Sequence, residues 1–391
     1  MDLREQTMEY RKLKTINDYI RKSVNPAKSP DTLFEMYSVP IFETGHPEYL
    51  LGREIASNKT VVQKNDILLC KINPRINRVW IVADESENPN IASSEWIVVR
   101  SSKYNPEFLA WYFRSPRFKN LMTSEVTGIG GSLTRAQPKS VAEYPVPVLE
   151  KPEQDAIAII FNTVDTIIKK RRKQLQKLDE LVKARFVELF GDCVLNSKGW
   201  KTKRLGDIAE VGSSKRVFVE DLKESGIPFY RGTEIGALAE GKTVTPELFI
   251  SKEHYAELCI ATGAPNIGDL LMPSICPDGR IWVVNTEKPF YFKDGRVLWV
   301  HAIDDSYNPV FLLYTLKDRI MSDYSSIASG TTFAELKIFA LKECHVFDVP
   351  LELQNQFAAF VNQTDKSKVA VQKALDEAQL LFDSLMQKYF G

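Results

Sequence analysis

Apolar residues recur at alternating steps of three and four in two long stretches of the chain, which is the spacing of helices in a coiled coil. In the later stretch these positions hold Leu375, Ala378, Phe382, Leu385 and Tyr389. At the same phases the earlier stretch holds Leu175, Leu178, Val182, Arg185 and Leu189, with Arg185 as the one polar exception. The pattern predicts two long helices, at residues 153–190 and 353–390, that pair antiparallel within one chain.

The two predicted helices are copies of each other, separated by 200 residues without a gap. Identical residues stand at nine positions: Gln154, Ala158, Asn162, Asp165, Lys173, Leu175, Leu181, Phe190 and Gly191, each repeated 200 residues later. Because a repeated helix can pack against its copy, whatever precedes each helix is presented twice. This organisation favours a binding protein with two similar binding domains over an enzyme with one catalytic pocket.

The segments before the helices repeat as well. A polar turn carrying Asp66 or Asp269 leads into an apolar run, and a second run contains Trp80 or Trp282, which we expect in the core. An Asn-Pro pair at 105–106 and again at 308–309 is typical of a helix start. The fold class is therefore α+β: domains 1–150 and 192–350, of mixed strands and helices, are followed by long helices at 151–191 and 351–391.

Composition restricts the class of protein. The chain has 391 residues, 44% of them hydrophobic and 26% charged, which describes a globular protein. Five scattered cysteines and four dispersed histidines lack metal-ligand spacing, so we expect reduced thiols, a cytoplasmic location and neither metal nor cofactor. The 51 basic and 51 acidic residues cancel, and a protein that held DNA unaided would usually be basic. A partner that supplies phosphate contacts remains compatible with this balance.

One motif suggests a different chemistry. Residues 236–243 fit the phosphate-binding pattern G-x-x-x-x-G-K-[ST], with Gly241, Lys242 and Thr243 at its end. That chemistry needs a buried strand before the loop and a helix after it. Here a β-branched pair and Pro246 follow, so a surface hairpin is the favoured interpretation. A nucleotide hydrolase remains the alternative from another functional class, and a protein scaffold that does not touch DNA is a third.

Several segments together resemble the specificity (S) subunits of type I restriction–modification systems. In the second repeat these are residues 204–210, 227–232 and 267–272, and in the first they are residues 36–40 and 66–80. Residues 190–192, at the end of the first long helix, resemble the close of the family's central conserved region. The order of domains matches over nearly the whole chain. One departure is residues 12–17, which replace the expected Leu-Gly-Asp-Ile opening.

The resemblance implies a non-catalytic protein that recognises a bipartite double-stranded DNA target, one half with each domain. It also implies that the helices set the spacer and bind modification (methyltransferase) subunits, two of them, with restriction subunits joining in the full complex. A related system, in which restriction and methylation share one partner polypeptide, stays open. So do two interpretations of residues 167–190, with eight basic and three acidic residues: a solvated face, or a surface for a partner or phosphate.

Base recognition uses Arg, Lys, Asn, Gln, Ser and Thr side chains carried by loops that face a DNA groove. In the first repeat the candidates are Lys71, Asn73, Arg75, Asn77, Arg78, Thr134, Arg135 and Gln137. In the second repeat they are Arg231, Thr233, Ser274, Arg280, Thr331 and Thr332. Each also has an ordinary interpretation as a turn residue or surface charge. The functional one is favoured most for Arg78 and Arg280, which enter the same predicted strand in both repeats.

Overall fold

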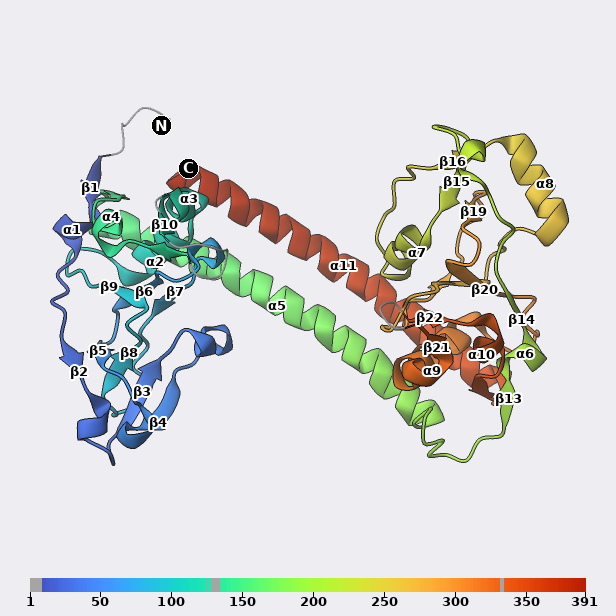
Figure 1. Ribbon diagram of the computed structural model, residues 1–391, viewed down its shortest axis with the longest axis horizontal. Helices are drawn as coiled ribbons and strands as arrows, with labels where there is room; N and C mark the ends of the chain where they lie inside the picture. The colour runs from blue at the N-terminus through green and yellow to red at the C-terminus, as the bar shows by residue number, and fades with distance from the viewer. Residues whose placement is uncertain (1–8, 125, 128–133, 331–333) are drawn as a thin grey trace. The chain divides into compact units, whose positions relative to one another are not determined.

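The computed structural model describes residues 9–124, 126–127, 134–330 and 334–391 (Figure 1). It divides into two compact units. Unit 1 contains Met1–Lys173 and Gln372–Gly391, and unit 2 contains Gln174–Val371. Each unit therefore holds one domain together with a portion of each long helix.

Unit 1 is built on two sheets and two short strand pairs. The five-stranded sheet has the order β2 (Ser23–Val24), β5 (Lys59–Val61), β8 (Asn90–Ala92), β3 (Leu33–Tyr37), β4 (Glu48–Leu51). The three-stranded sheet has the order β7 (Val79–Ile81), β6 (Ile67–Cys70), β9 (Trp96–Val99). The strand pairs are β1 (Tyr10–Lys12) with β12 (Pro145–Pro147) and β10 (Val126–Thr127) with β11 (Arg135–Ala136). Its shorter helices are α1 (Leu13–Ile16), α2 (Pro106–Arg114), α3 (Pro116–Ser124) and α4 (Pro138–Val141).

Unit 2 repeats this plan. Its four-stranded sheet has the order β14 (Glu210–Gly212), β20 (Val297–His301), β17 (Leu270–Pro273), β18 (Trp282–Val283). The other strands are β16 (Phe249–Ile250), β15 (Ile227–Tyr230) and β19 (Tyr291–Phe292) in one sheet, and the pairs β13 (Thr202–Arg204) with β23 (His345–Phe347) and β21 (Ala328–Ser329) with β22 (Glu335–Leu336). Its shorter helices are α6 (Leu205–Ile208), α7 (Gly232–Ala239), α8 (Lys252–Thr262), α9 (Pro309–Ile327) and α10 (Ile338–Lys342).

The register shows that the repeat extends to individual residues. Strand β6 lies between β7 and β9 in unit 1, as β17 lies between β18 and β20 in unit 2. Cys70 faces Trp96, and at the corresponding place Pro273 faces Val297. Helices α2 and α9 both start at a proline after an asparagine whose side chain caps the first turn. The predicted burial of the two tryptophans at positions 80 and 282 is confirmed.

The long helices are α5 (Lys151–Phe190) and α11 (Leu351–Phe390). In unit 1, Phe161 stacks on Phe390 with ring centroids 5.4 Å apart, and the Arg172 guanidinium donates to Gln379 at 3.4 Å. In unit 2, Asp179 pairs with Lys368 at 2.8 Å. As the residue number on α5 increases, the number of the residue that it contacts on α11 decreases. The two helices therefore run antiparallel in both units. The predicted α+β fold with an antiparallel helix pair is confirmed.

The last turns of each long helix enter a domain core. In unit 2, the Phe190 ring lies 4.7 Å from that of Phe311 on α9 and 5.7 Å from that of Phe357 on α11. In unit 1, the Phe390 ring lies 5.7 Å from that of Phe108 on α2. Phe190 and Phe390 are 0% and 3% exposed, so the end of each helix is part of the domain core that it contacts.

The repeated glutamine near each helix start joins that helix to the helix after the Asn-Pro turn. The Gln154 side chain accepts the backbone N–H of Asn105 at 2.7 Å and donates to the Leu149 carbonyl at 2.8 Å. The Gln354 side chain accepts the backbone N–H of Asn308 at 2.8 Å. Both glutamines are buried, at 2% and 0% exposure, so loss of these bonds would leave buried polar groups unsatisfied.

Candidate nucleic-acid interface

The two candidate segments of the first repeat, more than fifty residues apart in sequence, lie side by side in unit 1. The Asn73 N–H donates to the Thr134 carbonyl at 2.8 Å, and the Ala136 N–H donates to the Lys71 carbonyl at 2.8 Å. An isolated antiparallel bridge joins Ile72 to Arg135 between these bonds. The polar residues of both segments are therefore presented from one backbone platform.

Unit 2 joins the corresponding segments in the same way. The Leu336 N–H donates to the Ser274 carbonyl at 2.8 Å, at the place where Ala136 bonds Lys71 in unit 1. Ser274 is only 2% exposed, so this candidate contributes its backbone to the platform and not a free side chain. The candidates Thr331 and Thr332 lie outside the described residues.

In unit 1, the segment after β6 has two turns in the left-handed backbone region. Asn73 has a φ of 48° and Asn77 a φ of 51°, on either side of a short 3-10 helix, η4 (Pro74–Ile76). Asparagine tolerates this region better than most residues, which gives both a structural role. Arg75 projects from η4 and is exposed, whereas Lys71 is half-buried and its Nζ donates to the Ser94 carbonyl at 2.7 Å. Arg75 is thus the freest cation of this segment.

Thr134, Arg135 and Gln137 lie on the second segment. Thr134 is 7% exposed, and Gln137 stands at the residue before α4. The Arg135 Nε lies 3.3 Å from an oxygen of Glu95, which comes just before β9. At the corresponding place in unit 2, Arg296 precedes β20 and pairs with Glu335. The same contact thus occurs in both units with the charges exchanged. No sequence pattern indicates this ion pair, because the corresponding positions of the two repeats carry opposite charges and therefore do not align as a repeat.

This exchanged ion pair gives a prediction for the platform. We expect Arg135→Glu alone to weaken target recognition in the first half-site, because two carboxylates would then face each other next to the segment. The double variant Glu95→Arg with Arg135→Glu, which copies unit 2, should restore most of the structural loss, since the pair couples by about 1 kcal/mol or less when partly exposed. Thermal unfolding of the two variants measures the coupling. If the single and the double variant lost the same thermal stability, the ion pair would not hold the segment in place.

The arginines at 78 and 280 both lie near carboxylates, Arg280 more closely than Arg78. The Arg78 side chain is 18% exposed and its Nε lies 3.9 Å from a Glu43 oxygen. The Arg280 Nε lies 2.8 Å from an Asp278 oxygen, and its Nη1 lies 3.6 Å from an oxygen of Glu240, just past α7. A Cβ on Gly236 would come within 2.8 Å of the same Nη1. Arg280 therefore packs against α7 while remaining partly exposed.

Arg231 and Thr233 stand at the start of α7, and both bond Glu234. Arg231 also donates to a Glu247 oxygen at 3.0 Å, and the Thr233 hydroxyl donates to Glu234 at 2.9 Å. Burial opposes ionisation of Glu234, but the hydrogen bonds from Arg231 and Thr233 lower its pKa to about 2. The carboxylate is therefore charged at neutral pH and holds the Arg231 guanidinium.

The phosphate-binding motif is not arranged for nucleotides. Its first residues form α7, and Gly241, with a φ of 73°, makes the turn after the helix end. The Lys242 ammonium pairs with Glu240. Lysine thus lies at the C-terminal end of a helix, where backbone carbonyls repel anions. The sequence prediction of a hairpin here was wrong, and the alternative of a nucleotide hydrolase loses its structural basis.

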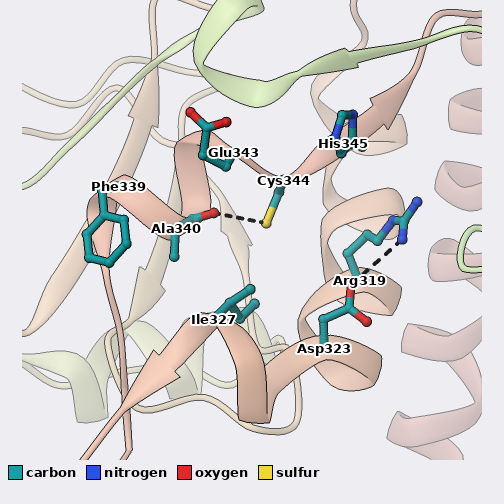
Figure 2. Close-up of a pocket in the computed structure, with 8 residues that line it drawn as sticks. All are labelled: Arg319, Asp323, Ile327, Phe339, Ala340, Glu343, Cys344 and His345. Atoms are coloured by element: carbon teal, nitrogen blue, oxygen red, sulfur yellow. Dashed lines mark hydrogen bonds and ion pairs between the residues drawn. The ribbon is translucent and has the colours of Figure 1, made fainter.

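Figure 2 shows a cavity of about 260 Å³ between the end of α9 and α10, below the usual range of small-molecule sites. It is lined by Arg319, Asp323, Ile327, Phe339, Ala340, Glu343, Cys344 and His345. Burial raises the pKa of Cys344 to about 11, so its thiol is protonated at neutral pH and is a poor nucleophile. Among the described residues, no group of three or more metal-binding side chains is gathered, and no described helix could cross a membrane.

The comparison of this chain with known protein families agrees with the presence of one backbone platform in each unit. Residues 197–378 match the family model of the type I restriction modification DNA specificity domain. The predicted resemblance of the chain to type I specificity subunits is confirmed. Type I specificity subunits are non-catalytic and recognise DNA, in agreement with the prediction for this chain.

Individual relatives cover much of the chain. The type I restriction enzyme MjaIX specificity subunit of Methanocaldococcus jannaschii is 24% identical over 309 residues, which are 72% of this chain and 67% of that protein. The crystal structure of a type I restriction-modification system S subunit from M. genitalium has a TM-score of 0.57 at 15% identity, covering 100% of this chain and 98% of that one.

A second solved structure comes from work on complex assembly and conformational transition of the type I R-M system. It has a TM-score of 0.54 at 20% identity, covering 100% of this chain and 99% of that one. Both structures support the fold alone. The match to the specificity-domain model and to a type I specificity subunit supports recognition of a DNA target within a type I restriction–modification system, in which specificity subunits assemble with other subunits.

Proposed function

We propose that this chain recognises a bipartite double-stranded DNA target with two target-recognition domains, residues 1–150 and 192–350. The conserved long helices, residues 151–191 and 351–391, set the spacer and bind two methyltransferase subunits, and restriction subunits join the full complex. The observation that carries the proposal is the duplicated platform, Lys71 with Ala136 in unit 1 and Ser274 with Leu336 in unit 2. Two similar platforms suit two half-sites.

The proposed DNA contacts are ranked by their exposure and partners. Arg75 is the leading candidate in unit 1, because it is exposed and lies on the tip of η4. Arg280 is the leading candidate in unit 2. Its side chain is 35% exposed, and nearby carboxylates pair with only its Nε and Nη1. Arg78, which is more buried, acts through the position of the loop that it supports. An arginine that contacts a guanine would contribute about 1–3 kcal/mol of discrimination.

The exposed sides of the long helices support the proposed binding of methyltransferase subunits. Leu181 and Leu381, identical in the two helices, are 49% and 51% exposed. Val369 and Leu380 on α11 are 71% and 73% exposed. A protein partner that covered these side chains would remove their apolar surface from water, which favours binding. The identity and equal exposure of the two leucines favour two copies of one partner.

The decisive experiment exchanges residues 204–345 for the matching region of another type I specificity subunit. We expect the hybrid, assembled with its methyltransferase subunits, to change one half of the methylated sequence and keep the other half and the spacer. The reason is that each domain has its own sheets and platform while the helices stay the same. Genome-wide methylation mapping of cells that carry the hybrid provides the measurement. A change in both halves would contradict independent recognition by the two domains.

The related system with a fused restriction–methylation partner remains the second candidate. In that system the chain would have the same domains and helices, and only the partner would differ. Isolation of the complex from its native cells separates the two, because the fused system yields one large partner polypeptide in place of separate methyltransferase and restriction subunits.

A further inference from the structure

A group of cations lies on one side of α5 within unit 1. Lys169, Lys170 and Lys173 are all exposed. At about 100° per residue, the three lysines fall within a sector of about 100°. The buried residues of the same helix segment, Phe161, Val164 and Ile168, lie on the opposite side and are 0%, 6% and 5% exposed. We call the sector of Lys169, Lys170 and Lys173 the lysine face.

The lysine face is poorly neutralised by the protein. Lys169 pairs with Asp165 at 2.8 Å, with 73% of its side chain still exposed. Lys170 and Lys173 have no ion-pair partner among the residues that the structure describes. Residues three or four positions from either lysine along the helix include no carboxylate. In a chain with zero net charge, three neighbouring cations with one acidic partner form a local excess of positive charge.

The second helix differs at the same positions. Val369 and Ala370 on α11 stand where α5 has Lys169 and Lys170, and only Lys373 matches. Lys368, another cation of α11, is half-buried and paired with Asp179 and Asp365 at 2.8 and 3.3 Å. The face of three lysines is therefore found on α5, whereas the same sector of α11 holds only Lys366 and Lys373, and this difference shows that three lysines are not required for the two helices to pair.

We infer that the lysine face binds phosphates of the DNA between the two half-sites. This inference rests on the proposed function and assigns a sequence-independent contact to the helix that sets the spacer. Lysine contributes often to phosphate contacts and is depleted from protein–protein interfaces. Such a contact would add affinity without adding bases to the recognised sequence.

The test uses the full chain assembled with its methyltransferase subunits and a duplex that carries the target. In the triple variant Lys169→Ala, Lys170→Ala, Lys173→Ala, the plot of log K against log salt concentration should become shallower by about 2–3 units, since each phosphate contact contributes about 0.9. Alanine preserves the helix. The methylated sequence should stay the same. The matched control, Lys366→Ala with Lys373→Ala on α11, should leave the slope at its wild-type value.

Three results would overturn the inference. An unchanged salt dependence in the triple variant would show that these lysines are only solvated. Loss of a methyltransferase subunit from the triple variant, with normal helix content by circular dichroism, would assign the face to a protein partner. A wild-type complex that binds no DNA would overturn the proposed function together with this contact, whereas the first two results leave the proposed function intact.

Discussion

Insertion of four residues after Gln174 is expected to lengthen the spacer between the half-sites, whereas insertion of two residues is expected to abolish assembly. Four residues add about 6 Å to α5, and a base pair rises about 3.4 Å, so the spacer should grow by one or two base pairs. Both half-sequences should stay the same, because the platforms lie outside the helices. Four residues turn the helix by only about 40° beyond one full turn, so the buried stripe keeps approximately its side.

The two-residue insertion fails for a physical reason that the structure supplies. It rotates the end of α5 by about 200°, which would turn Val182, Phe186 and Phe190 out of the core of unit 2. These three side chains are at most 2% exposed. Their exposure would cost several kcal/mol, at about 1.5–3 kcal/mol for each buried apolar side chain.

Methylation mapping in cells that carry each variant with its partners measures the spacer. A control insertion of the same four residues in the exposed segment after Thr243 should leave the spacer unchanged. An active four-residue α5 variant with the original spacer would show that something other than α5 determines the distance between the half-sites.

The second large effect concerns the phenylalanines at the helix ends. Phe190→Ala should destabilise unit 2 and Phe390→Ala unit 1, each by about 3–5 kcal/mol, the usual cost of removing a fully buried phenylalanine ring. Phe190 lies among Phe186, Phe311 and Phe357, so its removal leaves a cavity between three aromatic rings.

Urea unfolding gives the total loss, and hydrogen exchange locates it. Exchange should rise first in α9 for Phe190→Ala and in α2 for Phe390→Ala. Ile159→Ala on α5, at a side chain that is 65% exposed, is the matched control and should change stability by less than about 0.5 kcal/mol. If both phenylalanine variants loosened the same unit, the helix ends would not belong to separate cores.

The sequence was sufficient for the architecture because the elements carry strong local signals. The helix stripe, the Asn-Pro helix starts at 105 and 308 and the turns before β6 and β17 all depend on neighbouring residues. The stripe did miss Phe186 and Met386, which are buried at 2% and 6% exposure. They lie beside the predicted positions because the helix ends also pack on a domain, as Phe186 does on Phe311 of α9.

The candidate site was less accessible from sequence. Backbone pairing of Lys71 with Ala136 and of Ser274 with Leu336 joins segments more than sixty residues apart, and no local pattern reports such pairing. Polar residue type alone also could not distinguish the exposed Arg75 from the buried Ser274. Neither interpretation of the motif at 236–243 agrees with the structure. Glu234 and the small residues after it form a helix, which neither a phosphate-binding loop nor a hairpin would contain.

The sharing of helix ends between units has a consequence for the order of events during synthesis. Unit 1 includes Gln372–Gly391, so its core lacks Phe390 until α11 has left the ribosome. Until then Phe108 and Phe161, which contact that ring, have no partner from α11. Unit 2 is continuous from Gln174 to Val371 and can close earlier. The first of the two domains to be synthesised is thus completed after the second, and its aromatic residues Phe108 and Phe161 wait for Phe390 to follow.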